Sequence, residues 1–403
     1  MRILLISRCP PWPLYLGDRL IVYHLAEEME ARKHELDLLA FADRPEDWQE
    51  QSHYDHLFNQ VQLFKEPRRS PLSYLKRLLL PTLRFPKSAE QSWSPEMWKA
   101  IEAQLATTHY DAIHLFGGIQ VYEFYSALKG RKAIITPYES FSLYLRRLIE
   151  NTNTRKGQRS FPTDVMNRIQ FQIARRFESF MFTPYADTIV VSERDRDELV
   201  QINPTLKVTV IPNGVDTYEF RPRQVQRIPA LLFVGNYEYA PNVDAALRLA
   251  TEIFPAVLAR VPQARLWLVG NAPPSELTAL ANDSIRVTGR VPDVRPYLAR
   301  ASAFVSPLRL GAGIKNKVLE ALAMGCPVVA TSVSLDGIAV HHGQDALAAD
   351  GETMIDAIVG LLQDENLRET LSTNGRKLIE SRYSWNHVAQ QYEDLYKKRS
   401  ISV

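Results

Sequence analysis

The chain has 403 residues, more than a single hydrophobic core usually serves, so we expect at least two domains. Its 45% hydrophobic and 23% charged residues are typical of a soluble globular protein, and a net charge of +2 excludes a dedicated nucleic-acid binder. Two cysteines, Cys9 and Cys326, exclude a disulfide framework and fit a reducing compartment.

Short apolar segments alternate with amphipathic ones from the N-terminus onward, which is the pattern of βαβ units around a parallel sheet. In the first half we expect helices at Asp18–Ala31, Pro95–Leu105 and Asp164–Phe182. The strands expected between them are Arg2–Ser7, Glu35–Phe41, Val61–Lys65, Tyr110–Phe116, Ala133–Pro137 and Thr188–Ser192.

The same alternation starts again after Pro229, with helices expected at Asn242–Ala259 and Lys317–Met324. The strands expected there are Ala230–Gly235, Arg265–Gly270, Ile285–Thr288, Ala303–Pro307 and Pro327–Ala330. Turn residues in Ile211–Asp216 separate the two series. The sequence therefore predicts two doubly wound α/β domains, covering residues 1–207 and 208–383.

A glycine-bearing loop between a strand and a helix, from Pro307 to Ala321, has the geometry of an anion site. Backbone N–H groups and the positive end of the helix would converge on the anion. Arg309, Lys315 and Lys317 add charge beside the loop. A charge-assisted hydrogen bond contributes about 1.5–3 kcal/mol, so two or three would hold a diphosphate.

Lys317 and Glu320 lie three residues apart on one face of the predicted helix. A surface ion pair worth ~0.2–0.5 kcal/mol is one interpretation. In the other, Lys317 meets a phosphate and Glu320 accepts hydrogen bonds from a ribose diol, as acidic residues do in dinucleotide folds. Gly311 and Gly313 favour the second, because a surface helix needs neither.

The ordered succession of motifs in the second half resembles the family 4 retaining glycosyltransferases of the GT-B fold. In the N-terminal half the resemblance is looser and rests on Pro11, Pro13, Gly17 and Val190–Glu193. In the C-terminal half it rests on Ile211–Asp216, Phe233–Asn236, Leu268–Gly270, Gly289–Val294, Glu320–Thr331 and Tyr383–Trp385.

The resemblance implies a fold of two Rossmann-like domains facing across a cleft, with a C-terminal helix, residues 384–403, that returns to the N-terminal domain. It is nearest to the branch that includes bacterial exopolysaccharide transferases, and it implies a nucleotide-diphosphate sugar as donor. By resemblance Arg309 and Lys317 neutralise the diphosphate in catalysis and Glu320 binds the ribose. The remaining donor-binding residues implied are Gly17, Gly235, Asn236, Gly311, Ala312, Gly313 and Ile314.

Two positions depart from the family pattern. Many relatives carry a glutamate eight positions before the ribose-binding one, where it contacts the donor sugar, and here that residue is Ala312. Many also carry Arg and Lys after the strand that ends at Gly235, where this chain has Asn236 to Tyr239. The second departure places more of the phosphate binding on Arg309 and Lys317.

On the acceptor side, Glu139 follows a predicted strand and could position the acceptor hydroxyl as a catalytic group. Alternatively, Glu139 caps the next helix or pairs with Arg146 or Arg147. His114 lies within an apolar strand, where a hydrogen-bonded core histidine is the commoner outcome. The C-terminal half has no Asp-x-Asp motif to hold a metal on the diphosphate, and no zinc spacing is present, so we expect no metal and no cofactor.

Residues 67–87 combine basic side chains with an apolar run and contain no acidic residue. This composition suits the surface of an anionic membrane, at ~1 kcal/mol per basic residue. A solvated basic loop with its apolar face on its own domain is the alternative. Because no window approaches the ~20 apolar residues of a membrane span, we expect a cytoplasmic protein that can work at the inner face of the membrane.

These features together predict a retaining, metal-independent glycosyltransferase that moves a sugar to a glycan or lipid-linked acceptor in polysaccharide or glycoconjugate synthesis. A non-catalytic nucleotide-sugar or glycan binder and a nucleotide-sugar epimerase of the same fold remain alternatives. A nicotinamide dehydrogenase is disfavoured, because Gly-x-Gly-x-x-Gly is missing after the first strand of each domain.

Overall fold

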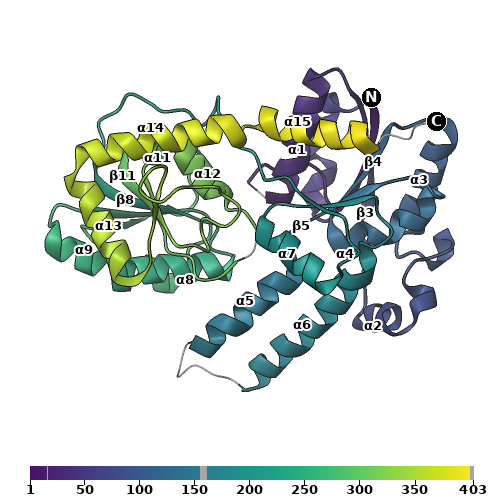
Figure 1. Cartoon of the computed structure of the whole chain (residues 1–403), viewed down its shortest axis with the longest axis horizontal. Helices are drawn as coiled ribbons and strands as arrows, with labels where there is room; N and C mark the ends of the chain where they lie inside the picture. Colours follow the sequence, from purple (N-terminus) through teal and green to yellow (C-terminus); the bar gives the residue numbers. More distant parts are fainter. Residues whose placement is uncertain (16, 155–160, 312, 400–403) are drawn as a thin grey trace. The chain divides into compact units, whose positions relative to one another are not determined.

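The computed structural model describes residues 1–15, 17–154, 161–311 and 313–399. Side chains are described for these residues except in 151–164. It divides into two compact units (Figure 1). The first runs from Met1 to Pro212 and includes the C-terminal residues from Val388 on; the second is Asn213–His387.

This division corrects both predicted boundaries by a few residues. The strand Val208–Val210 hydrogen-bonds to the edge of the first sheet, which moves the first boundary beyond residue 207. Ser384 pairs with Val215 in an isolated bridge, and the Val215 amide donates to the Tyr383 carbonyl at 2.7 Å, so residues 384–387 stay with the second unit.

The first unit contains a seven-stranded parallel sheet in the order β3-β2-β1-β4-β5-β6-β7. The order reverses direction between β1 and β4, which makes the carboxyl ends of these two strands a topological switch point. The strands are β1 (Arg2–Ser7), β2 (Glu35–Ala42), β3 (Gln60–Lys65), β4 (Ala112–Phe116), β5 (Ile134–Tyr138), β6 (Asp187–Val190) and β7 (Val208–Val210).

Helices and short 3-10 turns connect these strands, and α5 packs against α6 in a pair visible in Figure 1. The 3-10 turns are η1 (Pro45–Trp48), η2 (Glu50–His53), η3 (Asp55–Leu57), η4 (Pro81–Leu83), η5 (Ala89–Gln91) and η6 (Tyr122–Leu128). The helices are α1 (Gly17–Ala31), α2 (Pro71–Leu79), α3 (Pro95–Thr107), α4 (Gly118–Val121), α5 (Phe141–Thr154), α6 (Phe161–Met181), α7 (Glu193–Ile202) and α15 (Trp385–Arg399).

The C-terminal helix α15 completes the first unit from Val388 on, as the sequence predicted apart from its first residues. Its Tyr396 hydroxyl lies 2.6 Å from Nδ1 of His114 in β4, and its Arg399 guanidinium lies 2.6 Å from a carboxylate oxygen of Asp187 in β6. These contacts explain why the chain end belongs with the N-terminal residues rather than with the residues that precede it.

The second unit is a smaller Rossmann-like unit with a six-stranded parallel sheet in the order β10-β9-β8-β11-β12-β13. Its helices are α8 (Ala240–Arg248), α9 (Phe254–Arg260), α10 (Ser275–Thr278), α11 (Arg295–Arg300), α12 (Asn316–Ala323), α13 (Gly351–Gln363) and α14 (Glu365–Arg382), with a π-helical turn η7 (Leu249–Ile253) joining α8 to α9. Its strands are β8 (Ile228–Val234), β9 (Arg265–Val269), β10 (Ile285–Val287), β11 (Ala301–Ser306), β12 (Val328–Ala330) and β13 (Leu347–Ala348).

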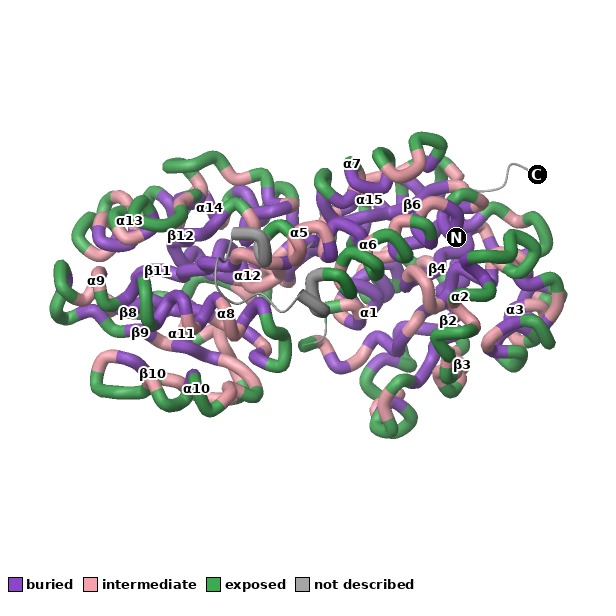
Figure 2. The backbone as a smooth tube through the Cα atoms, turned by 90° about the horizontal axis from the view of Figure 1, so that it is seen from below, coloured by how far each residue is buried: buried purple, intermediate pink, exposed green. Residues whose placement is uncertain are grey.

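The central strands of both sheets are buried along most of their length (Figure 2). Parallel sheets covered on both faces need such continuous apolar strands, for example Leu4–Ile6 in β1 and Leu231–Phe233 in β8. Within the residues that the structure describes, no helix combines the length and the apolarity that crossing a bilayer requires.

Candidate functional site

The predicted donor-binding residues of the second unit gather at the switch point of its sheet. The order reverses direction between β8 and β11, where ligands of doubly wound folds bind beyond the carboxyl ends of the strands. Gly235 and Asn236 directly follow β8, and the loop that begins at Pro307 follows β11 and leads into α12. Residues far apart in the sequence thus meet at the carboxyl edge of the second sheet.

The glycine loop after β11 takes backbone conformations that most side chains avoid. Gly311 has φ 129° and Gly313 has φ 66°. The Lys315 amine donates to the Gly313 carbonyl, and a Cβ on Gly311 would lie 3.2 Å from the Lys315 Cε. The loop therefore curls closely around Lys315. Ile314 is buried, and Ala312 lies outside the described residues.

The start of α12 carries an unusual concentration of positive charge. Lys315 occupies the N-cap, Lys317 lies in the first turn, and that turn contains no acidic residue. Helix N-termini normally attract Asp, Ser or Asn, because the N–H groups and the helix dipole present positive charge there. Two lysines at this end are unfavourable unless an anion joins them, so this helix start suits a phosphate group.

Lys317 is held in a largely desolvated position. Its amine donates to Oδ1 of Asn242 at 2.6 Å and lies 4.6 Å from the centre of the Phe233 ring. Burial, with added repulsion from Lys315, lowers the pKa of Lys317 to about 7, and the attraction of Glu320 only partly opposes the shift. Burial likewise raises the pKa of Glu320 to about 7 against the attraction of Lys317. Desolvation is the largest cause of both shifts, which favours a desolvated pair over a solvated surface ion pair; the roles of Lys317 toward a phosphate and of Glu320 toward a ribose stay predictions.

Asn242 is a site residue that the sequence analysis missed. It lies in the first turn of α8, and its Nδ2 donates to the Asn236 carbonyl at 2.7 Å while its Oδ1 accepts from Lys317. One amide thus links the loop after β8 to the helix after β11. The sequence placed Asn242 only at the start of a helix, and no local pattern pairs it with a lysine 75 residues away.

Arg309 is engaged by a carboxylate that the sequence analysis also missed. Its guanidinium forms two hydrogen bonds with Asp244 of α8, at 3.1 and 2.8 Å, and its side chain is 27% exposed. This bidentate arrangement fixes the orientation of the guanidinium. The role of Arg309 toward a diphosphate stays a prediction, because its charge is already paired.

In the first unit, Gly17 and Glu139 lie near the carboxyl edge of the sheet. Gly17 begins α1 and Glu139 follows β5; both are exposed. The start of α5 is held by another carboxylate, since Glu178 accepts from the Phe141 amide at 2.8 Å and from the Ser140 hydroxyl at 3.1 Å. Burial raises the pKa of Glu178 to about 7. The catalytic role of Glu139 stays a prediction.

His114 is the core residue that the sequence favoured. It is fully buried, with Nε2 2.7 Å from the Thr136 hydroxyl and Nδ1 2.6 Å from the Tyr396 hydroxyl. Burial lowers its pKa to about 3, so the ring is neutral at physiological pH. A neutral ring with both nitrogens engaged serves the attachment of α15 rather than proton transfer.

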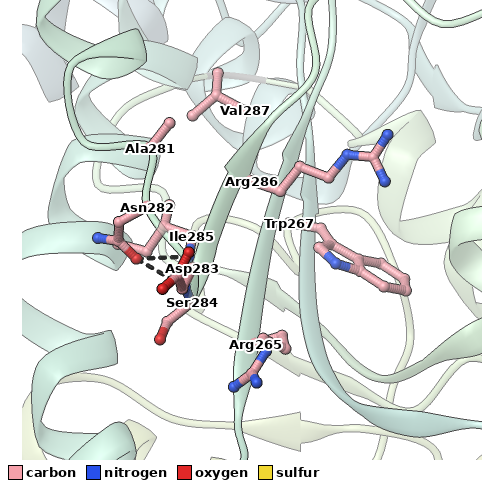
Figure 3. A pocket seen from close by; sticks show the side chains of 9 residues that line it. All are labelled: Arg265, Trp267, Ala281, Asn282, Asp283, Ser284, Ile285, Arg286 and Val287. Carbon is pink, nitrogen blue, oxygen red and sulfur yellow. Dashed lines mark hydrogen bonds between the residues drawn. The ribbon is translucent and has the colours of Figure 1, made fainter.

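A shallow pocket of about 490 Å³ lies on the outer strands of the second sheet, away from the switch point (Figure 3). Figure 3 shows Arg265, Trp267 and Arg286 projecting from β9 and β10 beside a turn in which Asn282 accepts from the Ser284 and Ile285 amides, at 2.8 and 3.0 Å. None of the predicted donor-binding residues lines it.

Comparisons with known proteins agree with the resemblance to glycosyltransferases that the sequence motifs indicate. The model of Glycosyltransferase Family 4 matches residues 20–219, and the model of Glycosyl transferases group 1 matches residues 228–364. The two matches lie one in each half of the chain.

Among curated proteins, the chain is 30% identical over 206 residues to a phosphatidyl-myo-inositol mannosyltransferase of Mycolicibacterium smegmatis, covering 46% of this chain and 51% of the relative. It is 28% identical over 219 residues to a GDP-mannose-dependent alpha-(1-6)-phosphatidylinositol monomannoside mannosyltransferase of Mycobacterium tuberculosis, covering 48% and 57%. The chain thus spans about half the length of the curated relatives it matches.

Among solved structures, sucrose-phosphate synthase from Thermosynechococcus elongatus superposes with a TM-score of 0.70 at 20% identity, covering 98% of both chains. This likeness concerns the fold, and it confirms the predicted two-domain GT-B architecture. The two family models, which together match most of the chain, and the relatives named above show that the chain belongs to the family 4-like glycosyltransferases.

Proposed function

We propose that the chain is a retaining glycosyltransferase that moves a sugar from a nucleotide-diphosphate sugar to a hydroxyl of a glycan or lipid-linked acceptor, in polysaccharide or glycoconjugate synthesis. The observation that carries this proposal is the pair of lysines at the start of α12, at the switch point of the second sheet. An anion would turn this unfavourable concentration of charge into a binding site.

In the proposed reaction the positive groups act on the leaving diphosphate. Lys317, supported by Arg309, stabilises the negative charge that develops as the bond between sugar and phosphate breaks. Glu320 accepts hydrogen bonds from the ribose, and the backbone of the glycine loop contacts the sugar. Glu139 positions the acceptor hydroxyl. The names of the two mycobacterial relatives support a mannosyl donor and a phosphatidylinositol-type acceptor as the first to try.

We further propose that the protein works in the cytoplasm at the inner face of the membrane, with residues 67–87 in contact with the lipid surface. Supporting this, α2 exposes Leu72, Leu75 and Leu79 beside Lys76. Nearness to the exopolysaccharide branch and independence from metal ions both stay predictions.

The test measures the thermal stability of the metal-free protein with and without GDP, UDP, ADP or dTDP. The same measurement is made on the variants Lys317→Ala and Glu320→Ala. The exposed Lys377 of α14 offers a matched control, Lys377→Ala. At ~100 times its dissociation constant one nucleotide should stabilise the protein by about 2.7 kcal/mol. The effect should vanish in the two site variants and persist in the control; equal stabilisation of all four proteins would sink the donor-site assignment.

Transfer itself is tested with the sugar of the nucleotide that binds. Release of the nucleoside diphosphate that depends on an added acceptor supports a transferase, and NMR of the product reports whether the anomeric configuration is retained. Binding without any turnover would favour the non-catalytic binder, and an isomerised donor sugar would favour the epimerase. Turnover that stops with a chelator and returns with a divalent ion would contradict metal independence.

A further inference from the structure

A second pocket lies within the first unit, bounded by residues of α2, α4 and α6 and by the segment that follows β5. Its volume is about 700 Å³, within the ~300–1,000 Å³ of typical small-molecule sites. The ring of Tyr74 in α2 lies 6.0 Å from that of Phe177 in α6, so these two helices meet where both line the pocket. None of the predicted donor-binding residues lines it.

The walls of this pocket are mainly apolar, and the apolar surface continues outside it. Leu75 and Ile173 line the pocket and are 46% and 39% exposed, while Leu79 and Ile169 lie on the same helices outside the lining and are 60% and 49% exposed. Large apolar side chains left in water next to an apolar cavity mark a binding surface rather than a finished core.

The two helical segments that flank the pocket carry mainly positive charge. Residues 67–87 contain no acidic residue, and residues 165–181 contain only Glu178, whose carboxylate is buried and turned toward the start of α5. Exposed cations on these two segments are Arg68, Lys76, Lys87, Arg168 and Arg176. An anionic ligand with an apolar body is therefore complementary to this surface, whereas a neutral glycan is not.

The pocket also reaches the edge of the sheet where the acceptor is expected. Its lining includes Arg8 after β1, Gly118 after β4 and Glu139 after β5. Arg8 pairs with Asp18 at 3.1 Å, and Arg69 pairs with Glu66 at 2.9 Å while its Nε lies buried with no hydrogen-bond partner. A ligand that fills the apolar part would bring its polar head to this edge.

We propose that this pocket binds the apolar chain of an anionic membrane lipid, which serves as the acceptor. The apolar chain lies between α2 and α6, the anionic group of the head lies toward Arg8, and the acceptor hydroxyl lies toward Glu139. The inference rests on the proposed function only in naming the lipid as acceptor; the binding site itself stands on the pocket, its exposed apolar walls and its positive surroundings.

The experiment is calorimetric titration of the full chain with monomeric alkyl phosphates, from hexyl to dodecyl phosphate, below their micelle concentrations. Each added methylene should tighten binding by about fourfold, which corresponds to ~0.8 kcal/mol per buried CH₂. Dodecyl maltoside, with the same chain and a neutral head, should bind more weakly than dodecyl phosphate.

Three variants separate the pocket from the surface around it. Ala174→Phe fills the pocket without reducing its apolar character, and Ile173→Gln makes polar a lining residue whose side chain is exposed. Leu79→Gln is the matched control, because Leu79 is exposed on α2 but does not line the pocket. We expect the chain-length dependence to disappear in the first two variants and to remain in the third.

Binding that is unchanged in Ala174→Phe and Ile173→Gln would overturn the proposal in favour of adsorption to the surface, and so would the absence of any binding to wild type. The nucleotide titration on the same preparations keeps the two proposals apart. Nucleotide binding without alkyl phosphate binding rejects only the lipid pocket, and the reverse result rejects only the donor site.

Discussion

Replacing Lys317 with methionine should stabilise the free protein while abolishing nucleotide binding. Methionine keeps the unbranched stem beside the Phe233 ring and removes the charge. The pKa of Lys317 is lowered from 10.5 to about 7, and every tenfold change in proton affinity corresponds to ~1.36 kcal/mol. The upper bound on the cost of this charge is therefore about 5 kcal/mol. Partial exposure of the side chain and the loss of the hydrogen bond to Asn242 reduce the expected gain to ~1–2 kcal/mol near pH 7.

The sign of the pH dependence follows from the direction of the shift. Because the folded protein holds the Lys317 proton less tightly than the unfolded chain, the cost is complete below pH 7 and disappears as the pH rises toward 10.5. The advantage of Lys317→Met in urea-unfolding free energy should therefore be largest at and below pH 7 and should shrink toward pH 10. If Lys317→Met is less stable than wild type at pH 7, or if the difference in unfolding free energy between the two does not depend on pH, the inference that burial of the Lys317 charge destabilises the protein is refuted.

Three further predictions concern the surroundings of Lys317 and of His114. Nucleoside diphosphate affinity should fall above about pH 7, by at most about tenfold per pH unit, because Lys317 loses its proton there; titration calorimetry that shows a flat profile would contradict this. In Asn242→Asp, a carboxylate beside the amine should raise the pKa of Lys317 and move that fall to higher pH, and an unmoved profile would show that Asn242 does not set the environment of the lysine. His114→Leu should destabilise the protein by ~2–4 kcal/mol at pH 8 through two lost buried hydrogen bonds, and by ~0.8 kcal/mol less at pH 6, where the histidine of the unfolded chain gains a proton that the buried ring does not; an equal loss at both pH values would mean that the pKa of the ring is not lowered in the folded protein.

Most of the fold could be predicted from the sequence because buried parallel strands are continuous apolar runs. Strands such as Arg2–Ser7 and Arg265–Val269 are found within a residue of the predicted bounds. The missed elements lack this signal. The edge strand Val208–Val210 is only half-buried, and α2 lies in a basic segment whose composition also fits a loop or a membrane-contact segment.

The glycine loop and Lys317 could also be predicted, because a strand, a glycine loop and a helix follow one another directly in the chain. What surrounds them could not. Asn242 and Asp244 reach the site from α8, 75 and 65 residues away from their partners, and their hydrogen-bonding role depends on how two helices pack at one sheet edge. Glu178 similarly meets the start of α5 across 37 residues. Such partners are fixed by tertiary packing, which leaves no local pattern in the sequence.

The opposed pKa shifts of Lys317 and Glu320 imply that phosphate binding and ribose binding at the donor site strengthen each other. In the free protein desolvation favours the neutral form of each group, because it lowers the pKa of Lys317 and raises the pKa of Glu320. A diphosphate beside Lys317 favours its protonated form, and a fully charged lysine in turn favours the ionised form of Glu320, which is the better acceptor for ribose hydroxyls. By linkage, ribose binding at Glu320 strengthens phosphate binding at Lys317 to the same extent. A whole nucleoside diphosphate should therefore bind more tightly than the separate affinities of nucleoside and pyrophosphate predict, and in Glu320→Gln this excess should fall while pyrophosphate alone still binds.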